Sequence, residues 1–213
     1  MGLEIRCTLR LGPDDVTGTA HLDSTALAFR GTTRLSVPLA TVKTAEVAKG
    51  GELRVTHAAG AFSLLLGARA TAEKWALKVR YPKSLVDKLG LKPESHVAIL
   101  GLEDPEFAAQ TSARLRSPPR SSLPAKPPAA GTGLDFIFYP ADSAAELSRL
   151  ADLKRHLAPT GAIWVVSLKG KAARIKDVDV MRAAKAAGLV DNKVCGFSAT
   201  HTALKLVIPV ASR

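Results

Sequence analysis

Apolar residues recur at every second position through the first third of the chain, and this spacing limits what that part can fold into. The clearest case is residues 3–11, whose alternate residues are Leu3, Ile5, Cys7, Leu9 and Leu11. Because successive side chains of a strand point to opposite faces, the pattern predicts strands with one face in a core. Turn signals rich in Gly, Asp and Pro separate seven such runs at hairpin spacing. An antiparallel sheet of seven short strands is therefore expected before residue 67.

A helical pattern follows these runs, at residues 68–82. Its apolar face is formed by Ala72, Trp75, Ala76 and Val79, and Tyr81-Pro82 ends it. Seven strands followed by a helix that carries a tryptophan resemble the pleckstrin-homology superfold, and residues 18–42 and 60–79 look like its bacterial members. The resemblance implies an open barrel over residues 1–80, plugged by the helix and Trp75. Some relatives bind inositol phosphates through a basic loop after the first strand, but this loop carries Asp14 and Asp15, which disfavours that ligand.

The second part of the chain alternates near-continuous apolar runs with helical patterns. The runs at 97–100, 135–140 and 162–168 are typical of strands in a parallel sheet that is covered on both faces. Two further strands at the end of the chain are separated by a tight hairpin at Ala199-Thr200-His201. Helices are expected over residues 83–92, 105–113, 143–161 and 178–188, the last with Asp177 as its N-cap. This order predicts a mostly parallel sheet with a final antiparallel hairpin strand.

The second part also resembles two known groups. Residues 153–166 and the final hairpin are similar to the second half of class I methyltransferases, whose Rossmann-like sheet binds ligands at the C-terminal edge of its strands. Residues 81–213 as a whole resemble the bacterial domain of unknown function 3052 family. The segments that carry this second resemblance are residues 81–107, 143–166 and 188–209. It implies the Rossmann-like fold and no particular reaction.

The chain is thus expected to be a two-domain α+β protein. Residues 1–80 would form the pleckstrin-homology-like antiparallel barrel with its C-terminal helix, and residues 81–213 the short Rossmann-like α/β domain. A dinucleotide site in such a domain needs several glycines after the first strand and an acidic residue about 20 positions later, which binds the ribose. Gly101 is the lone glycine at that place, and residues 108–134 contain no acidic residue. No cofactor is therefore predicted.

Residues 110–133 are rich in Pro and Arg where a second strand would be expected. Their composition predicts a flexible cationic loop. Two interpretations stay open. The loop is either a flap over the ligand cleft or a tether for an acidic partner, or it is a solvated segment that replaces lost secondary structure.

Polar residues gather where the predicted parallel strands end. The candidates for an anion or ligand edge are Gly101, Asp104, Tyr139, Lys169, Lys171 and His201. Four cations within residues 169–176 would suit a phosphate or carboxylate, or would simply form a solvated basic loop. His201 could act as an acid or base, or could be hydrogen-bonded by Thr200 or Thr202. Asp104 before Pro105 is better explained as a helix N-cap, and no catalytic residue or metal ligand is assigned.

The net charge of +11 invites a nucleic-acid interpretation. The excess is spread over both halves, and aromatic residues make up only 5% of the chain, so platforms for base stacking are scarce. The cysteines, Cys7 and Cys195, are expected to be buried thiols, since two cysteines make neither a metal motif nor a disulfide framework. No apolar run approaches the roughly 20 residues that a membrane span requires, so a cytoplasmic protein without membrane insertion is expected.

These observations favour a bacterial binding or scaffold protein without catalytic activity. Its barrel would contact a protein or peptide, and its second domain would be a platform with a small anion at the sheet edge. Two alternatives stay open. One is a methyltransferase-related transferase with an unusual cofactor site, and the other is a basic protein associated with nucleic acid.

Overall fold

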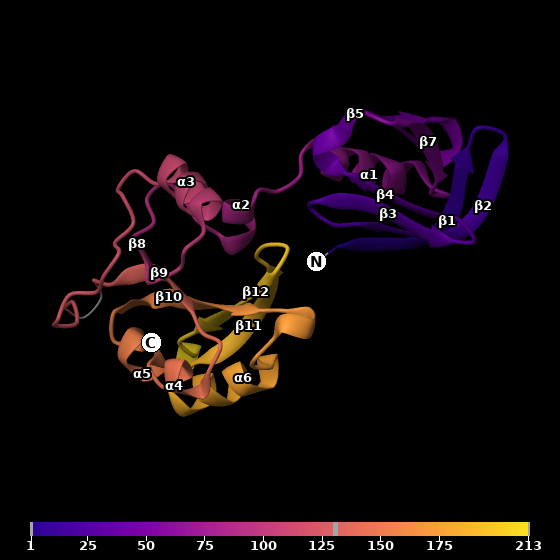
Figure 1. Cartoon of the computed structure of the whole chain (residues 1–213). Coiled ribbons are helices and arrows are strands. Elements are labelled where there is room, and N and C mark those ends of the chain that lie inside the picture. Colours follow the sequence, from indigo (N-terminus) through magenta and orange to yellow (C-terminus); the bar gives the residue numbers. More distant parts are fainter. Residues whose placement is uncertain (1, 130–131, 213) are drawn as a thin grey trace. The chain divides into compact units, whose positions relative to one another are not determined.

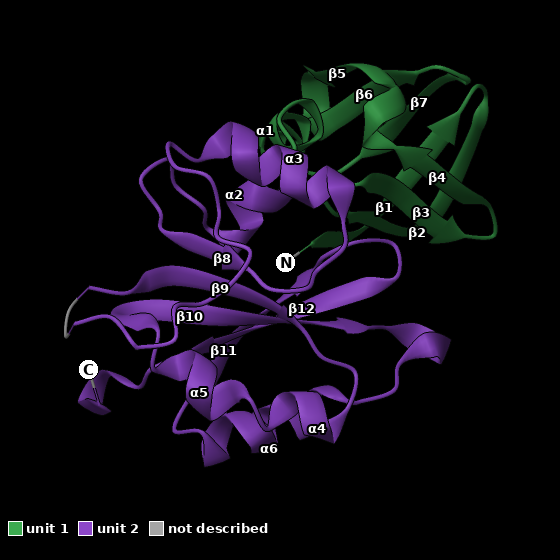
Figure 2. Cartoon of the chain, turned by 60° about the vertical axis from the view of Figure 1, so that its left-hand side comes forward, with its two compact units in different colours: residues 1–84 green, residues 85–213 purple. Residues whose placement is uncertain are grey.

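The structure, a computed structural model, describes residues 2–129 and 132–212. The chain divides into two units, residues 1–84 and residues 85–213 (Figure 1 and Figure 2). Each unit has a hydrophobic core of its own. Residues 130 and 131 of the predicted cationic loop lie outside the described residues. Among the helices described, none combines the length and the apolar character needed to span a bilayer.

Seven antiparallel strands form the sheet of unit 1, as the alternation of apolar residues predicts. They are β1 (Leu3–Leu11), β2 (Asp14–Leu22), β3 (Ala26–Gly31), β4 (Arg34–Pro38), β5 (Val42–Ala48), β6 (Glu52–His57) and β7 (Gly60–Leu65). The strand order is β4-β3-β2-β1-β7-β6-β5, so β4 and β5 are its edges. The strand pairings of the described residues do not join these two edges, and barrel closure therefore stays a prediction. Two short 3-10 turns, η1 (Leu39–Thr41) and η2 (Lys49–Gly51), flank β5.

The core of unit 1 lies between this sheet and the helix α1 (Arg69–Arg80). Cys7 and Leu9 of β1 are buried, and Leu3, Ile5 and Leu11 pack against the same core, which confirms the predicted strand face. The helix buries the four residues that its periodicity predicts, namely Ala72, Trp75, Ala76 and Val79. Burial of one apolar stripe fixes which side of the helix meets the sheet.

Five strands form a mixed sheet in unit 2. They are β8 (Val97–Ile99), β9 (Leu134–Pro140), β10 (Leu157–Leu168), β11 (Val190–Gly196) and β12 (His201–Val207). The order is β11-β12-β10-β9-β8, in which β8, β9 and β10 run parallel and β12 runs antiparallel to both of its neighbours. The predicted mostly parallel sheet with a final antiparallel strand is confirmed. His201, expected within the hairpin turn, is the first residue of β12.

The helices of unit 2 agree with the sequence in position but differ in extent. They are α2 (Leu85–Leu89), α3 (Pro105–Arg114), α4 (Ala144–Leu147), α5 (Leu150–Lys154) and α6 (Asp177–Ala186), with the 3-10 turns η3 (Gly170–Ala172) and η4 (Val210–Ser212). The single helix predicted over residues 143–161 is wrong, because α4 and α5 are separate and β10 begins at Leu157. Pro159 and Gly161 are poor helix formers, which is consistent with the strand there.

Two helix ends also differ from the prediction. Asp177 is the first helical residue of α6 rather than its N-cap, and the carboxylate of Asp179 accepts a hydrogen bond from the Lys176 amide at 3.0 Å. Residues 110–114 of the predicted loop belong to α3. The guanidinium of Arg114 donates to Asp87 Oδ1 at 2.6 Å and to the Leu91 carbonyl at 3.2 Å, so it ties α3 to the α2 region.

Candidate functional site

Helices cover both faces of the sheet in unit 2 (Figure 2). α2 and α3 pack on one face, where Phe138 and Trp164 are buried, and α4, α5 and α6 pack on the other, over Ile137 and Val165. The chain therefore turns toward one face after β8 and toward the opposite face after β9. Open α/β sheets bind ligands at such a switch point, beyond the carboxyl ends of the strands. We call residues 100–104, 141–143 and 169–172, which follow β8, β9 and β10, the sheet edge.

Gly101 begins the turn from β8 toward α3. Its φ of +66° lies in the left-handed region, which a residue with a Cβ adopts only at a cost. A Cβ added at this position would meet no atom within 4 Å, so the backbone conformation and not crowding favours glycine here. The position beside Gly101 is thus open rather than filled by other parts of the described chain.

Asp104 serves the fold, as its position before Pro105 predicts. Its Oδ1 accepts a hydrogen bond from the Phe107 amide at 2.9 Å and so caps the first turn of α3. The carboxylate therefore lies at the N-terminus of α3, where a bound anion would otherwise be stabilised by the helix. Asp104 is thus a structural part of the sheet edge.

The end of β9 carries a hydrogen-bonded network that the sequence analysis missed. The Asp142 carboxylate accepts from the Leu168 amide at 2.9 Å and links the ends of β9 and β10. Glu146 Oε2 accepts from the Asp142 amide and from the Ser143 hydroxyl, both at 2.7 Å, and the Glu146 amide donates back to Ser143 Oγ at 3.3 Å. The hydrogen bond from the Asp142 amide, followed by that from Ser143, lowers the pKa of Glu146. The Ser143-Ala-Ala-Glu146 spacing is a capping box, and it is the signal that could have revealed this network.

Tyr139 lies away from the ligand side of the sheet edge. Its ring is buried in the core on the α4–α6 face, and its hydroxyl donates to the Glu146 carbonyl at 3.2 Å. The guanidinium of Arg149 lies 5.5 Å from the centre of the ring. The tyrosine thus stabilises the start of the α4–α5 layer, and its hydroxyl is already used within the protein.

Lys169 and His201 are brought together, as their positions predict. Leu168 pairs with His201 across β10 and β12, and the Lys169 amide donates to the Thr200 carbonyl at 2.9 Å. The Lys169 ammonium donates to the Ser198 carbonyl at 2.7 Å. His201 Nδ1 lies 2.9 Å from Thr200 Oγ1 and 3.3 Å from Ser198 Oγ. The hairpin satisfies both side chains, in agreement with the structural alternative for His201.

Lys171 differs from Lys169, the other lysine among the candidate ligands. It lies exposed in η3, directly after the sheet edge, and within the described part of the chain it has no ion pair. Among the predicted anion ligands, Lys171 is therefore the side chain that a ligand could meet without displacing an internal hydrogen bond.

The outer edge of β8 is occupied by one residue of the predicted cationic loop. Arg120 forms a parallel bridge with Ala98, in which the Ile99 amide donates to the Arg120 carbonyl at 2.8 Å and the Arg120 amide donates to the Val97 carbonyl at 2.9 Å. A neighbouring strand would make the same bonds, so the loop partly replaces the strand that the sequence lacks. The side chain at this position is a cation, where a ribose-binding carboxylate would be expected.

Metal-binding groups are not assembled in the described residues, since no three His, Cys, Asp or Glu side chains lie close enough to share an ion. Cys7 and Cys195 are free and buried, as the sequence predicts. Burial raises the pKa of the Cys7 thiol and keeps it protonated.

Several solved structures are similar to the chain, all at low identity. The N-terminal PH domain of human ARAP2 is 11% identical over 46% of this chain and 89% of its own length, with a TM-score of 0.35. A TehB-like SAM-dependent methyltransferase from Corynebacterium glutamicum is 12% identical over 66% of this chain and 97% of its own length, with a TM-score of 0.36. Magnesium protoporphyrin IX methyltransferase from Synechocystis, with bound SAM, is 15% identical over 59% of this chain and 74% of its own length, with a TM-score of 0.35.

No family model and no curated protein matches the chain. The expected resemblance to the domain of unknown function 3052 family is therefore without support from a family match. With TM-scores below 0.5, the similar structures identify no family for the chain and assign no activity to it.

Proposed function

We propose that unit 2 is a methyltransferase-related domain that binds a ligand of the S-adenosylmethionine class at its sheet edge. The observation that carries the proposal is the divergence of the connections after β8 and β9 to opposite faces of the sheet, with β12 as the single antiparallel strand. A switch point of this kind is the place where open α/β sheets accept ligands. The left-handed Gly101 and the space beside it support this placement.

The mode of binding would be unusual. Arg120 stands beside β8 where an acid would hold the ribose, so the sugar would not be held from that side. Asp142 is the carboxylate nearest in sequence to the end of β9, and it would attract the sulfonium or ammonium charge of the ligand. Lys171 would meet the ligand's carboxylate. These roles need no movement of Asp104, Lys169 or His201 out of their internal hydrogen bonds.

The test is titration of the full chain with S-adenosylmethionine and S-adenosylhomocysteine, followed by calorimetry and thermal unfolding. Saturable binding at micromolar concentration should raise the melting temperature of unit 2 by several degrees, because a ligand that binds the native state alone stabilises it by mass action. The absence of any saturable shift at millimolar ligand would contradict the proposal. It would favour the non-catalytic platform that the sequence suggests.

Three variants distinguish a loss of binding at the sheet edge from a general loss of stability. Gly101→Ala should weaken binding at least about tenfold. Gly12→Ala should not, although its φ of +59° and open surroundings make its cost to the fold similar. Asp142→Asn keeps an oxygen for the Leu168 amide but removes the charge, so it should reduce affinity for the cationic S-adenosylmethionine more than for the neutral sulfur of S-adenosylhomocysteine. Equal losses for the two ligands would refute the role of Asp142.

A further inference from the structure

Unit 1 contains a groove of about 540 Å³ that the sequence analysis did not anticipate. Its lining includes residues 42–45 of β5, Leu39 of η1, Val79 and Arg80 at the end of α1, and Ser24 and Thr25 of the turn between β2 and β3. All of its lining residues belong to unit 1. The groove is therefore a feature of that unit by itself and is separate from the sheet edge of unit 2.

The groove lies against an edge strand of the sheet. It is lined by four consecutive residues at the start of β5, residues 42–45. β5 is the last strand of the sheet, and within the described residues its backbone pairs with β6 alone. In the described part of the chain, the peptide groups on its outer side therefore pair with no other strand. Such an edge is a template for pairing with another chain.

The groove has an apolar floor and positively charged side chains along its sides. Leu39, Ala45 and Val79 are buried and supply the floor. Lys43 and Arg80 are exposed, neither has an ion pair within the described residues, and no acidic side chain lines the groove. Lys43 lies at an irregularity in the pairing of β5 with β6, between Val42 and Thr44. Bulges of this kind redirect a side chain, which is consistent with a lysine placed at the rim for contact.

We propose that this groove binds an extended acidic peptide segment of a partner protein, which adds to β5 as a further strand. Main-chain hydrogen bonds to the open edge of β5 would hold the segment in register, and alternate apolar side chains would lie over Leu39 and Val79. Its carboxylates would meet Lys43 and Arg80. An acidic partner is favoured because two unpaired cations and no anion line the site, and complementary charge raises both the rate and the specificity of association.

The first experiment selects binders from a library of random nonapeptides displayed on phage, with the full chain as target at near-physiological salt. Selected peptides are then synthesised and measured by fluorescence polarisation. We expect enrichment of acidic residues that alternate with apolar ones, with micromolar affinity. Absence of any enriched peptide, or enrichment of basic peptides, would overturn the proposal.

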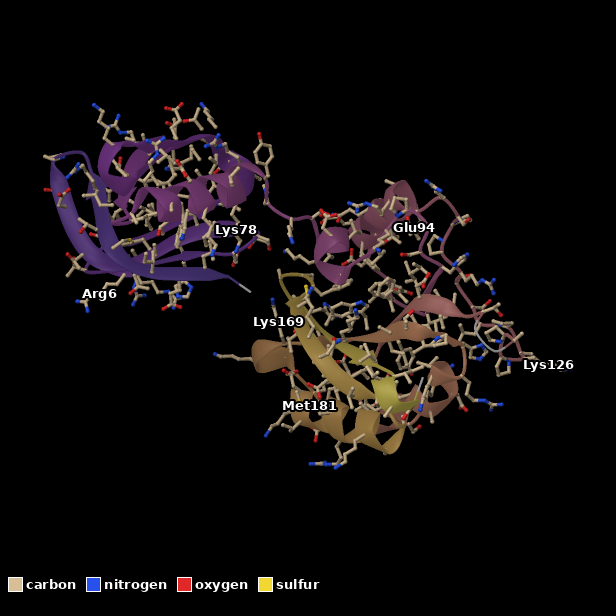
Figure 3. All side chains as sticks on the ribbon, turned by 180° about the vertical axis from the view of Figure 1, so that it is seen from behind. Arg6, Lys78, Glu94, Lys126, Lys169 and Met181 are labelled. Atoms are coloured by element: carbon tan, nitrogen blue, oxygen red, sulfur yellow. The ribbon has the colours of Figure 1, made fainter. Side chains whose placement is uncertain are left out.

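A pair of matched variants tests the place of binding. The double variant Lys43→Glu with Arg80→Glu should weaken the selected peptides at least about tenfold. The control, Arg6→Glu with Arg34→Glu, changes the net charge of unit 1 equally at two exposed positions outside the groove, of which Arg6 is labelled in Figure 3. An equal loss in both variants would indicate attraction to the overall charge and would contradict the proposal. Circular dichroism and thermal unfolding confirm that both variants fold.

The added strand is tested on the unaltered protein. Hydrogen exchange of residues 42–48 should slow at least about tenfold when peptide is bound, because open amides of β5 become hydrogen-bonded. Two peptides are compared, one N-methylated at the odd-numbered residues and one at the even-numbered residues. One of them should bind and the other should fail, since only every second amide faces β5. Unchanged exchange in β5, or equal binding of both methylated peptides, would refute strand addition. Displacement of the peptide by inorganic phosphate at low millimolar concentration would identify a simple anion site instead and would also overturn the proposal.

Discussion

The capping box at the end of β9 leads to a prediction whose size follows from the structure. Ser143→Ala removes the acceptor of the Glu146 amide and one donor to the Glu146 carboxylate, and Glu146→Ala removes the acceptor of the Asp142 amide. Loss of an N-cap side chain costs about 1 kcal/mol in the free energy of unfolding. Because Glu146 is solvent-exposed, Glu146→Ala should cost less than Ser143→Ala, about 0.5 kcal/mol of the free energy of unfolding. The double variant should lose less than the sum, since Ser143 and Glu146 share a hydrogen bond.

The same network predicts a pH dependence. Its hydrogen bonds lower the pKa of Glu146 in the folded protein below the unfolded value of about 4.3. The resulting stability is fully present above the unfolded pKa and is lost as the pH falls through the folded pKa, because the folded state holds the proton less well. The difference in unfolding free energy between the parent and Glu146→Gln should therefore be measurable at pH 7 and shrink steadily in acid below about pH 4.

Urea unfolding of unit 2 provides the assay. The chain has two tryptophans, Trp75 in unit 1 and Trp164 in unit 2, so a Trp75→Phe background leaves Trp164 as the reporter. Glu94→Gln is the matched control, because Glu94, labelled in Figure 3, is exposed and takes part in no helix cap of the described chain. Two results would refute the reasoning. One is an equal loss of stability in Glu94→Gln and Glu146→Gln at pH 7, and the other is a difference that keeps its full size at pH 3.

Three further outcomes follow from the structure. Asp104→Ala should lower the unfolding free energy of unit 2 by about 1 kcal/mol, because the Phe107 amide loses its acceptor. Asp104→Asn should keep most of the parent's stability in the same urea assay, because an Asn side chain also caps helices well. Gly18→Ala should destabilise unit 1 by at least about 2 kcal/mol, since its Cβ would lie 2.4 Å from the Arg30 carbonyl oxygen, and Trp75 emission during unfolding measures the loss. Cys7 should react with a thiol reagent far more slowly in the native protein than in urea, and fast native labelling would contradict its burial and raised pKa.

Local patterns account for the parts of the fold that the sequence analysis predicted correctly. The alternation along β1 and the spacing of Ala72, Trp75, Ala76 and Val79 in α1 depend on the geometry of a single element. The Asp104 cap likewise depends on residues that are neighbours in the chain. The separation of residues 143–161 into α4, α5 and the start of β10 was not predicted, although Pro159 and Gly161 disfavour a continuous helix there.

The candidate site was likewise predicted in part from local patterns, while its remaining features depend on contacts between distant residues. The sequence placed Gly101, Lys169 and His201 at one edge of a sheet, because residues that follow parallel strands must meet there. It did not reveal that Lys169 binds the Ser198 carbonyl, that Tyr139 points into the core on the α4–α6 face, or that Arg120 bridges to β8. Each of these depends on which distant residue the fold brings near.

By itself, the amino-acid sequence determined the two kinds of sheet, because a repeat of two residues and a near-continuous apolar run satisfy different patterns of burial. Tertiary structure alone decided which polar groups stay available to a ligand. Most candidates at the sheet edge already form internal hydrogen bonds. Within the described residues, by contrast, β5 of unit 1 pairs with β6 alone, and Lys43 and Arg80 beside it form no ion pair. The physical reason is that a buried or bonded polar group is fixed by its partner, and the partner is chosen by packing over the whole domain.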